Sequence, residues 1–465
     1  MTDSPPRRCL QRQLLTGLWP RPALVALVCF AWGQEAAAVD VAPPARTEAL
    51  AAARHVPLPE LDDEISLEDC LKYAVLNNHG LRAAHHRWQA AMAMLPQARS
   101  LPDPRLSYSY YVQEVETRVG PQRQSLALTQ MFPWFGKVRL QGDAAAKAAE
   151  AAWLEFQAQK LELAYRVSGL YHDLCLLQET IDVNQSSFDL LRSLEAVARE
   201  RYRTGEALTA VMQVQVELGK LEDRLRSLRE LRAPMVARLN AALSREPDAA
   251  LPWPLPPPKE MPELDPNALL GQMRDGNPNL ARLEAMSEKE RLAAELARKN
   301  GFPDITLGVS FIDTRDAEMP ADDSGKDPVM ATVSINLPIW RGKYRAQWRE
   351  AKSREAALQE EMKNRTNTLA ADLKLALYYY EDAGRQVGLY RDTLLPKAEQ
   401  SLGVARQAFQ AGKADFLAVV DAQRTLLEFR LAGAKARTEQ GKRLAEINML
   451  AGIGARPPEP EPSPE

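Results

Sequence analysis

The chain has little of what enzymes and nucleic-acid-binding proteins usually need. Its 465 residues include only four cysteines and five histidines, and no G-x-x-x-x-G-K-[ST], H-E-x-x-H or C-x-x-C motif occurs. The 59 basic residues nearly balance the 62 acidic residues, which argues against a nucleic-acid partner. Beyond the N-terminus there is no run of about twenty apolar residues, so no transmembrane helix is expected. We therefore expect neither an enzyme nor a bound cofactor or metal.

The few histidines gather near two methionines. His79, His85 and His86 lie close in sequence to Met92 and Met94, a set of side chains that can bind soft metal ions. Adjacent residues on a helix point in different directions, however, so His85 and His86 would not converge on one ion. Solvated positions on a helix explain this stretch better than a metal site.

The first 38 residues are typical of an export signal. Such a signal has a positive region, an apolar core and a small-residue cleavage site, here Arg7, Arg8 and Arg12, residues 23–32, and residues 36–38. Cys29 leaves lipid attachment open as an alternative. The sequence after the signal retains Cys70 and Cys175, which we predict to be buried thiols, although a disulfide in an oxidising compartment stays possible.

The rest of the chain is a duplication. Each half contains a helical pattern, two strand patterns, a long helix, a tight turn and another helix, and the landmarks recur in the same order after about 200 residues. We accordingly divide the chain into a signal peptide (1–38), an extended leader (39–65), a first repeat (66–246), a proline-rich linker (247–266), a second repeat (267–454) and a disordered tail (455–465).

Four runs alternate between apolar and other residues, which indicates strands with one apolar face each. The runs cover residues 106–112, 125–132, 305–311 and 329–337. Their apolar positions are Leu106, Tyr108, Tyr110 and Val112, then Leu126 and Leu128, then Ile305, Leu307, Val309 and Phe311, and finally Val329, Val333, Ile335 and Leu337.

Long helices follow each pair of strands. No proline occurs from Lys137 to about Arg203, and good helix formers dominate, so a helix of about 100 Å is predicted. A second such helix runs to about Gln410. Gly205 and Gly412 interrupt these helices, because glycine adopts the positive φ that reverses the chain tightly. A capping box at Ser66 and Asp69 marks the start of the first helix.

The junction between strand and long helix occurs twice, as FPWFGK and as LPIWRGK. Proline cannot donate to a strand ladder, so pairing ends there. Aromatic rings at this place suit a membrane interface, and glycine allows the backbone to bend. The predicted rim of the sheet consists of Pro133, Trp134, Phe135, Gly136, Pro338, Trp340 and Gly342.

Four strands cannot close a barrel without leaving edges. Each predicted strand nevertheless has about ten residues and one apolar face, which is the size needed to cross a bilayer at a tilt. Backbone groups in lipid must all be paired. If these strands enter a membrane, several copies must therefore pool them into one closed barrel, with the polar long helices in water.

These features resemble the TolC-like outer-membrane efflux family over about residues 66–454, and FPWFGK is most similar to the branch associated with heavy-metal or copper pumps. The resemblance implies a mainly α fold with a small β part. Duplicated long-helix hairpins would form a periplasmic α-barrel, and four strands per chain would contribute to a twelve-stranded transmembrane β-barrel in a homotrimer. The protein would then lie in the outer membrane of a Gram-negative bacterium, in contact with its lipid, and extend into the periplasm. It would be a passive exit duct for an inner-membrane RND-type pump, joined through a periplasmic membrane-fusion adaptor.

In this family the helix tips contact the adaptor, and aspartates often narrow the mouth just inside them. The matching tip residues are Arg203, Thr204, Gly205, Glu206, Gln410, Ala411, Gly412 and Lys413. Asp421, nine residues after Gly412, matches one constriction position, whereas Ala418 and Val211 are apolar where further aspartates would stand. Three carboxylates around one axis would attract cations. Alternatively, Asp421 pairs with Arg424 on a solvated helix face.

A different class of protein, a periplasmic coiled-coil adaptor or scaffold without a pore, is the alternative. An adaptor should have one long hairpin flanked by several small β domains. Two hairpins with only four strands disfavour that class, and a soluble scaffold does not need strands with one apolar face.

Overall fold

The computed structural model describes residues 65–205, 208–256, 258, 261–318 and 322–454. The expected signal peptide, the leader except Ile65, and the tail lie outside the described residues. The elements follow the order α3 (Leu67–Asn77), α4 (His79–Arg99), β1 (Arg105–Val115), β2 (Gln122–Phe132), α5 (Lys137–Arg203), α6 (Thr209–Leu243), α7 (Pro266–Gly276), α8 (Pro278–Lys299), β3 (Ile305–Thr314), β4 (Val329–Ile335), α9 (Arg341–Leu389), the π-helical segment η2 (Tyr390–Leu394), α10 (Leu395–Gln410) and α11 (Phe416–Ala451).

The first repeat begins with the capping box that the sequence predicts. The Ser66 hydroxyl accepts a hydrogen bond from the Asp69 N–H at 3.1 Å, and the Ser66 N–H donates to the Asp69 carboxylate at 3.4 Å. Helix α5 then runs without interruption for 67 residues, from Lys137 to Arg203, as predicted. At a rise of 1.5 Å per residue it is about 100 Å long.

The corresponding helix of the second repeat is continuous but not regular. It widens into the π-helical segment Tyr390–Leu394 directly before α10, where Pro396 occupies the first turn. Proline lacks the N–H that a regular helix would use and crowds the preceding turn, which favours such a local widening. The helix still ends at Gln410, as predicted.

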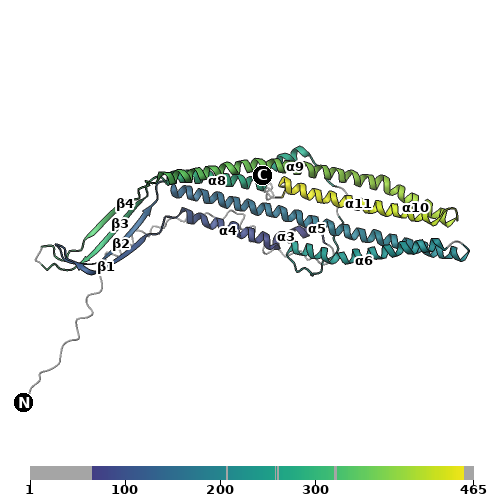
Figure 1. The fold of residues 1–465 in the computed structure, drawn as a ribbon, viewed down its shortest axis with the longest axis horizontal. Coiled ribbons are helices and arrows are strands. Elements are labelled where there is room, and N and C mark those ends of the chain that lie inside the picture. Colours follow the sequence, from purple (N-terminus) through teal and green to yellow (C-terminus); the bar gives the residue numbers. More distant parts are fainter. Residues whose placement is uncertain (1–64, 206–207, 257, 259–260, 319–321, 455–465) are drawn as a thin grey trace, which may run out of the picture. The chain divides into compact units, whose positions relative to one another are not determined.

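The helices pack along one another (Figure 1). Helix α5 contacts α4, α6, α8 and α11, while α9 contacts α8 and α11, so the two repeats share one helical layer. One apolar cluster, centred on Met273, Leu373 and Ile447, joins α7, α9 and α11. A second cluster joins the ends of α5, α6, α10 and α11. Cys70 and Cys175 are buried free thiols, as predicted, and desolvation by burial raises the pKa of each to about 12.

The strands form one antiparallel sheet in the order β1-β2-β3-β4. The strand bounds agree with the predicted runs at Phe132, Ile305 and Val329 and differ by up to three residues at the other ends. Only the fourth strand is shorter than predicted, because Leu337, which was expected in it, lies beyond its end at Ile335. The Leu337 carbonyl accepts instead from the Ile339 N–H at 2.9 Å, because the intervening Pro338 has no N–H with which to continue the ladder.

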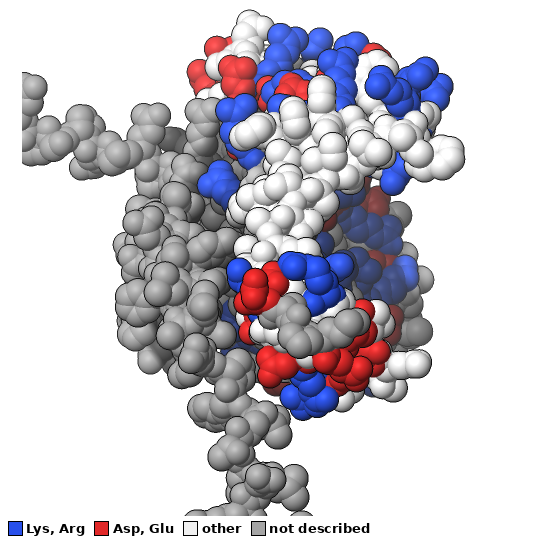
Figure 2. All heavy atoms as spheres, turned by 90° about the vertical axis from the view of Figure 1, so that its left-hand side faces the viewer, with Lys and Arg blue, Asp and Glu red and all other residues white. Residues whose placement is uncertain are grey.

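One face of this sheet is apolar and exposed. The register sets Leu106 opposite Leu128 and then Val309, and Tyr108 opposite Leu126 and then Phe311, so apolar side chains line up across the strands. On β1, Val112 is 95% exposed. Figure 2, which faces this end, shows an uncharged band with charged side chains above and below it.

The opposite face of the sheet is different in chemistry. Hydroxyl-bearing side chains and small residues are frequent on it, namely Ser107, Ser109, Ser125, Thr129, Thr306, Gly308, Ser310, Thr332 and Ser334, and they are interspersed with Met131, Ile312 and Met330. The second face is therefore more polar than the first, although it is not free of apolar side chains.

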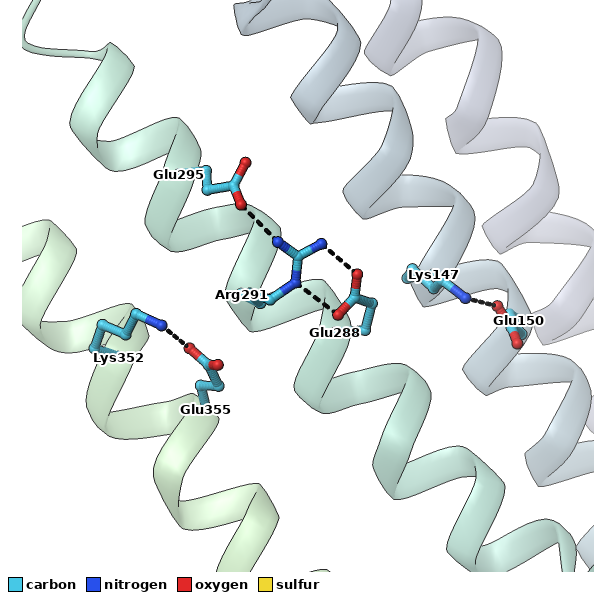
Figure 3. Close-up of polar contacts among 7 residues, drawn as sticks. All are labelled: Lys147, Glu150, Glu288, Arg291, Glu295, Lys352 and Glu355. Carbon is cyan, nitrogen blue, oxygen red and sulfur yellow. Dashed lines mark hydrogen bonds and ion pairs between the residues drawn. The ribbon is translucent and has the colours of Figure 1, made fainter. Parts of the chain in front are cut away.

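None of the helices among the described residues has the length and apolar character needed to cross a membrane. The helices next to the sheet carry ion pairs on their surfaces (Figure 3). These pairs are Lys147–Glu150 on α5, Arg291 with Glu288 and Glu295 on α8, and Lys352–Glu355 on α9, at 2.5–2.7 Å. Each pair lies within one helix, so each contributes only about 0.3–0.5 kcal/mol.

Candidate functional site: the strand–helix junctions and the helix tips

The first junction is tied to the start of the next repeat. Gly136 has a φ of +83°, which turns the chain from β2 into α5. The Lys137 Nζ then lies 2.7 Å from the Asp304 Oδ1, and the two side chains are only 6% and 17% exposed. The same Asp304 oxygen accepts the Trp134 N–H at 2.8 Å. A buried ion pair thus holds the end of β2 to the start of β3.

Aromatic side chains complete this junction. The ring of Trp134 stacks on Phe302 with centroids 5.6 Å apart, while Phe135 stays exposed. The Lys299 Nζ donates to the Phe135 carbonyl at 3.0 Å, and a Cβ on Gly136 would approach that Nζ to 3.0 Å. The positive φ is therefore the main requirement for glycine at this position, because the lysine end can move away from an added Cβ.

The second junction repeats the turn but not its partners. The Lys343 N–H donates to the Trp340 carbonyl at 3.0 Å, as the Lys137 N–H does to Trp134 at 3.0 Å. Trp340 is nevertheless 75% exposed, and Lys343 is exposed too. Gly342 lies inside the first turn of α9, so the bend expected there precedes the glycine. This junction lies beside β4, an edge of the sheet.

Two glycine turns form the helix tips. Gly205 and Gly412 have φ values of +105° and +72°, the left-handed region that glycine adopts most readily. The Lys413 N–H donates to the Ala408 carbonyl at 2.8 Å and the Gly412 N–H to the Phe409 carbonyl at 3.0 Å, which closes the end of α10. Glu206 lies outside the described residues.

An aromatic pair lies under the second tip, and the sequence alone did not reveal it. The rings of Phe409 and Phe416 lie 5.5 Å apart, and both side chains are buried. The Arg201 guanidinium, from the first tip, lies 4.6 Å from the centre of the Phe409 ring, a cation–π contact. The spacing F-x₆-F around Gly412 was the available signal. The two tips are thus joined within one chain.

Asp421 lies on α11, beyond the tip. Its side chain is 63% exposed, and its Oδ1 is 3.8 Å from the Arg424 Nη1. Arg424 binds Glu217 of α6 more closely, at 2.6 Å. Burial alone would raise the pKa of Glu217, but the hydrogen bonds from Arg424 and Lys220 outweigh it and lower the pKa. Arg424 is therefore shared, and Glu217 is its main partner.

The histidines do not form a common site. His85 packs against the rings of Trp88 and Phe156, whereas the His86 Nδ1 lies 2.9 Å from the Gln89 Oε1. Within the described residues, no three side chains of histidine, cysteine, aspartate or glutamate gather in a way that could hold a metal ion.

Known proteins share this arrangement. Residues 269–452 match the family model described as outer membrane efflux protein. The cobalt-zinc-cadmium resistance protein CzcC of Cupriavidus metallidurans is 24% identical over 373 residues, which cover 79% of this chain and 85% of CzcC. The pyoverdine export outer membrane protein OpmQ of Pseudomonas putida is 22% identical over 448 residues, covering 90% of this chain and 92% of OpmQ. The second half of the chain therefore matches the outer membrane efflux protein model, and the whole chain is similar to TolC-like efflux proteins.

The fold of this TolC-like chain agrees with a solved structure. The outer-membrane channel OprN superposes with a TM-score of 0.71 at 20% identity, covering 84% of this chain and 91% of OprN. The predicted fold class, mainly helical with a small sheet, is confirmed. These similarities locate the protein in the outer membrane of a Gram-negative bacterium, from which it extends into the periplasm.

Proposed function

We propose that three copies of this chain form the exit duct of a tripartite efflux system. Together they contribute twelve strands to one closed barrel in the outer membrane, and their helices form an α-barrel in the periplasm. The observation that carries this proposal is the open four-stranded sheet, whose exposed face is apolar and whose opposite face is rich in hydroxyl groups.

The chemistry of the two faces supports a closed barrel whose apolar face is on the outside and whose polar face is on the inside. The apolar face meets lipid at no desolvation cost, whereas the face with Ser107, Thr129 and Ser310 would line a wet lumen. A sheet of four strands still leaves the backbone groups of β1 and β4 unpaired at its edges, which lipid does not tolerate. Neighbouring copies supply the missing partners.

The first test is where the chain is found and in what state. We expect it in the outer-membrane fraction as an oligomer that migrates as a trimer on gels without heating and as a single chain after boiling. Recovery of the mature chain as a soluble periplasmic monomer contradicts the proposal and favours a coiled-coil scaffold instead. A periplasmic marker protein controls for leakage between fractions.

The helix tips are the proposed docking site of a periplasmic membrane-fusion adaptor. Arg203 and Lys413 lie at the two tips and are exposed, and the turns that carry them are fixed by backbone hydrogen bonds. Such a rigid, exposed end suits helix-to-helix docking. Charge reversal of both residues should abolish cross-linking to the adaptor while leaving the trimer intact, and undiminished cross-linking would contradict this role.

We further propose an RND-type pump as the inner-membrane partner and heavy-metal ions as the substrate. The FPWFGK junction and the similarity to CzcC support this choice, whereas the similarity to OpmQ points to the export of pyoverdine instead. Deletion of the gene should lower tolerance of cobalt, zinc or cadmium salts more than tolerance of organic drugs. A larger loss of tolerance to organic drugs than to metal salts would contradict heavy-metal ions as the substrate.

At the mouth, Asp421 is proposed to form a ring of three carboxylates. Its 63% exposure supports this role, although Arg424 lies near enough to weaken its charge. Asp421→Ala should raise conductance in planar bilayers or reduce cation preference, because it removes charge and bulk from the constriction. Asp248→Ala, in the linker, is the control. Unchanged conductance and selectivity would exclude Asp421 from the constriction.

A further inference from the structure

The contact at the first junction joins two neighbouring strands, and the equivalent residues of the second junction lie apart. Lys137 follows β2 and Asp304 precedes β3, so their ion pair of 2.7 Å bridges adjacent strands. By the duplication, the corresponding residues are Lys343, after β4, and Asp103, before β1. Both are exposed, because β4 and β1 are the two edges of the sheet.

The correspondence extends beyond the two charges. Both junctions read W-x-G-K, and in both the lysine N–H donates to the tryptophan carbonyl at 3.0 Å. Trp134 stacks on Phe302, the residue two positions before Asp304. Trp340 is exposed, and so is Leu101, two positions before Asp103. The second junction thus has a tryptophan, a lysine, an aspartate and an apolar partner for the ring, as the first one has, but they are divided between the two edges.

We infer that Lys343 of one copy forms an ion pair with Asp103 of the next copy, and that Trp340 packs on its Leu101. The inference rests on the proposed homotrimer and adds to it the residues and the register of contact. Strand direction permits this contact. Because the chain contributes an even number of antiparallel strands, β1 of the next copy runs antiparallel to β4, as β3 does to β2.

The strand register agrees with the charge pairing. In the chain, Leu128 of β2 lies opposite Val309 of β3. Transferred through the duplication with Pro133 aligned on Pro338 and Asp304 on Asp103, this register sets Val333 of β4 opposite Tyr108 of the next copy. The one extra residue of the second junction then lies after the strand, between Pro338 and Lys343. Both side chains belong to the exposed apolar face, so the apolar face continues across the contact. A slip of one residue would set Tyr108 opposite Ser334 of the polar face, where the two side chains would be mismatched.

A charge-reversal cycle tests the ion pair in the full-length chain. Lys343→Glu and Asp103→Lys should each lower the temperature at which the trimer dissociates by about 5 °C or more, because one pair is lost at every contact between copies. The double variant should recover most of that loss. Lys326→Glu, an exposed lysine in the loop between β3 and β4, makes the same charge change away from the contact.

Cross-linking tests the register. With a short bis-maleimide reagent, which adds to two cysteine thiols, Tyr108→Cys combined with Val333→Cys should give covalent trimers, and Tyr108→Cys combined with Ser334→Cys should not, since those positions lie on opposite faces. Suppose that the wild-type chain forms trimers. The inference is then wrong if the single variants do not lower trimer stability, if the double variant recovers none of the loss, or if the pair with Ser334→Cys cross-links better, and the proposed function still stands. A wild-type chain that never forms trimers overturns both.

Discussion

The helix tips and the strand end of this chain differ in how much of their apolar side-chain surface is buried within one copy. At the tips, Phe409 and Phe416 are buried against each other, and Arg201 reaches across from the other repeat. At the strand end, Trp340 and Val112 are 75% and 95% exposed. Exposed apolar area of this extent marks a surface that meets lipid or another protein.

The duplication makes this difference instructive. The two junctions have nearly the same sequence, yet the first is closed by contacts within the chain and the second is open. Sequence alone therefore does not decide whether a junction is complete, because its position in the sheet does. Variants at the two ends should separate the contacts that fold one chain from those that join copies.

The largest expected effect comes from Lys137→Met. It leaves the Asp304 carboxylate, which is 17% exposed, without its cation, which should cost about 3 kcal/mol in the free energy of unfolding of the chain in detergent, measured by urea titration. Lys343→Met is the matched control, because Lys343 is exposed in a single chain. Equal losses of unfolding free energy for the two variants in the monomeric chain would show that the first junction is no more closed within one copy than the second.

The next effect concerns the aromatic pair at the tips. Phe416→Ala empties a fully buried position and should cost about 3 kcal/mol locally, seen as faster proteolysis next to Arg203 and Lys413. The heat stability of the trimer should not change, because the sheet is remote from this cluster. Leu417→Ala, at a half-exposed neighbouring position, is the control. A large loss of trimer stability from Phe416→Ala would show that the two ends are coupled.

A smaller effect is expected from the glycine turns. Gly205→Ala and Gly412→Ala place a side chain at positive φ, which costs about 1–2 kcal/mol each. Hydrogen exchange should accelerate at the substituted tip and not at the strand end. Gly403→Ala, where a Cβ would meet nothing within 4 Å, should leave exchange unchanged or slow it. Equal changes in hydrogen exchange for all three alanine variants would show that the positive φ of Gly205 and Gly412 is not the cause.

The smallest effect is the pH dependence of the Glu217–Arg424 pair. The pKa of Glu217 is lowered from 4.5 in the folded chain, so the stabilisation is present above pH 4.5 and is lost as the pH falls through the lowered pKa. Because Arg424 is half exposed, we expect only about 0.5 kcal/mol. The unfolding temperature of Glu217→Gln should equal that of the wild type at pH 3.5 and should be lower than that of the wild type at pH 6. A constant difference would contradict this linkage.

Much of the fold follows from local patterns. Helix α5 has its predicted ends because helix formers fill it and no proline interrupts it. The alternation of Leu106 with Ser107, and of Val309 with Ser310, predicts both the strands and their two faces. These features depend on neighbours in the sequence, so they can be predicted from the sequence alone.

The contacts between distant elements could not be predicted in the same way. Asp304 was a landmark of the duplication, but its bond to Lys137 depends on β2 and β3 being neighbours. Likewise, Arg424 was expected beside Asp421, three positions along one helix face, and its closer partner Glu217 comes from another helix. Such partners become visible only when the packing of the helices is known.

The most direct test of the central claim, that copies must share strands to close the sheet, is the mass of the particle extracted from the outer membrane. Native mass spectrometry of the detergent-extracted wild-type protein should give a mass of three chains, with single chains only after heating. A folded, membrane-derived particle with the mass of one chain would contradict the account.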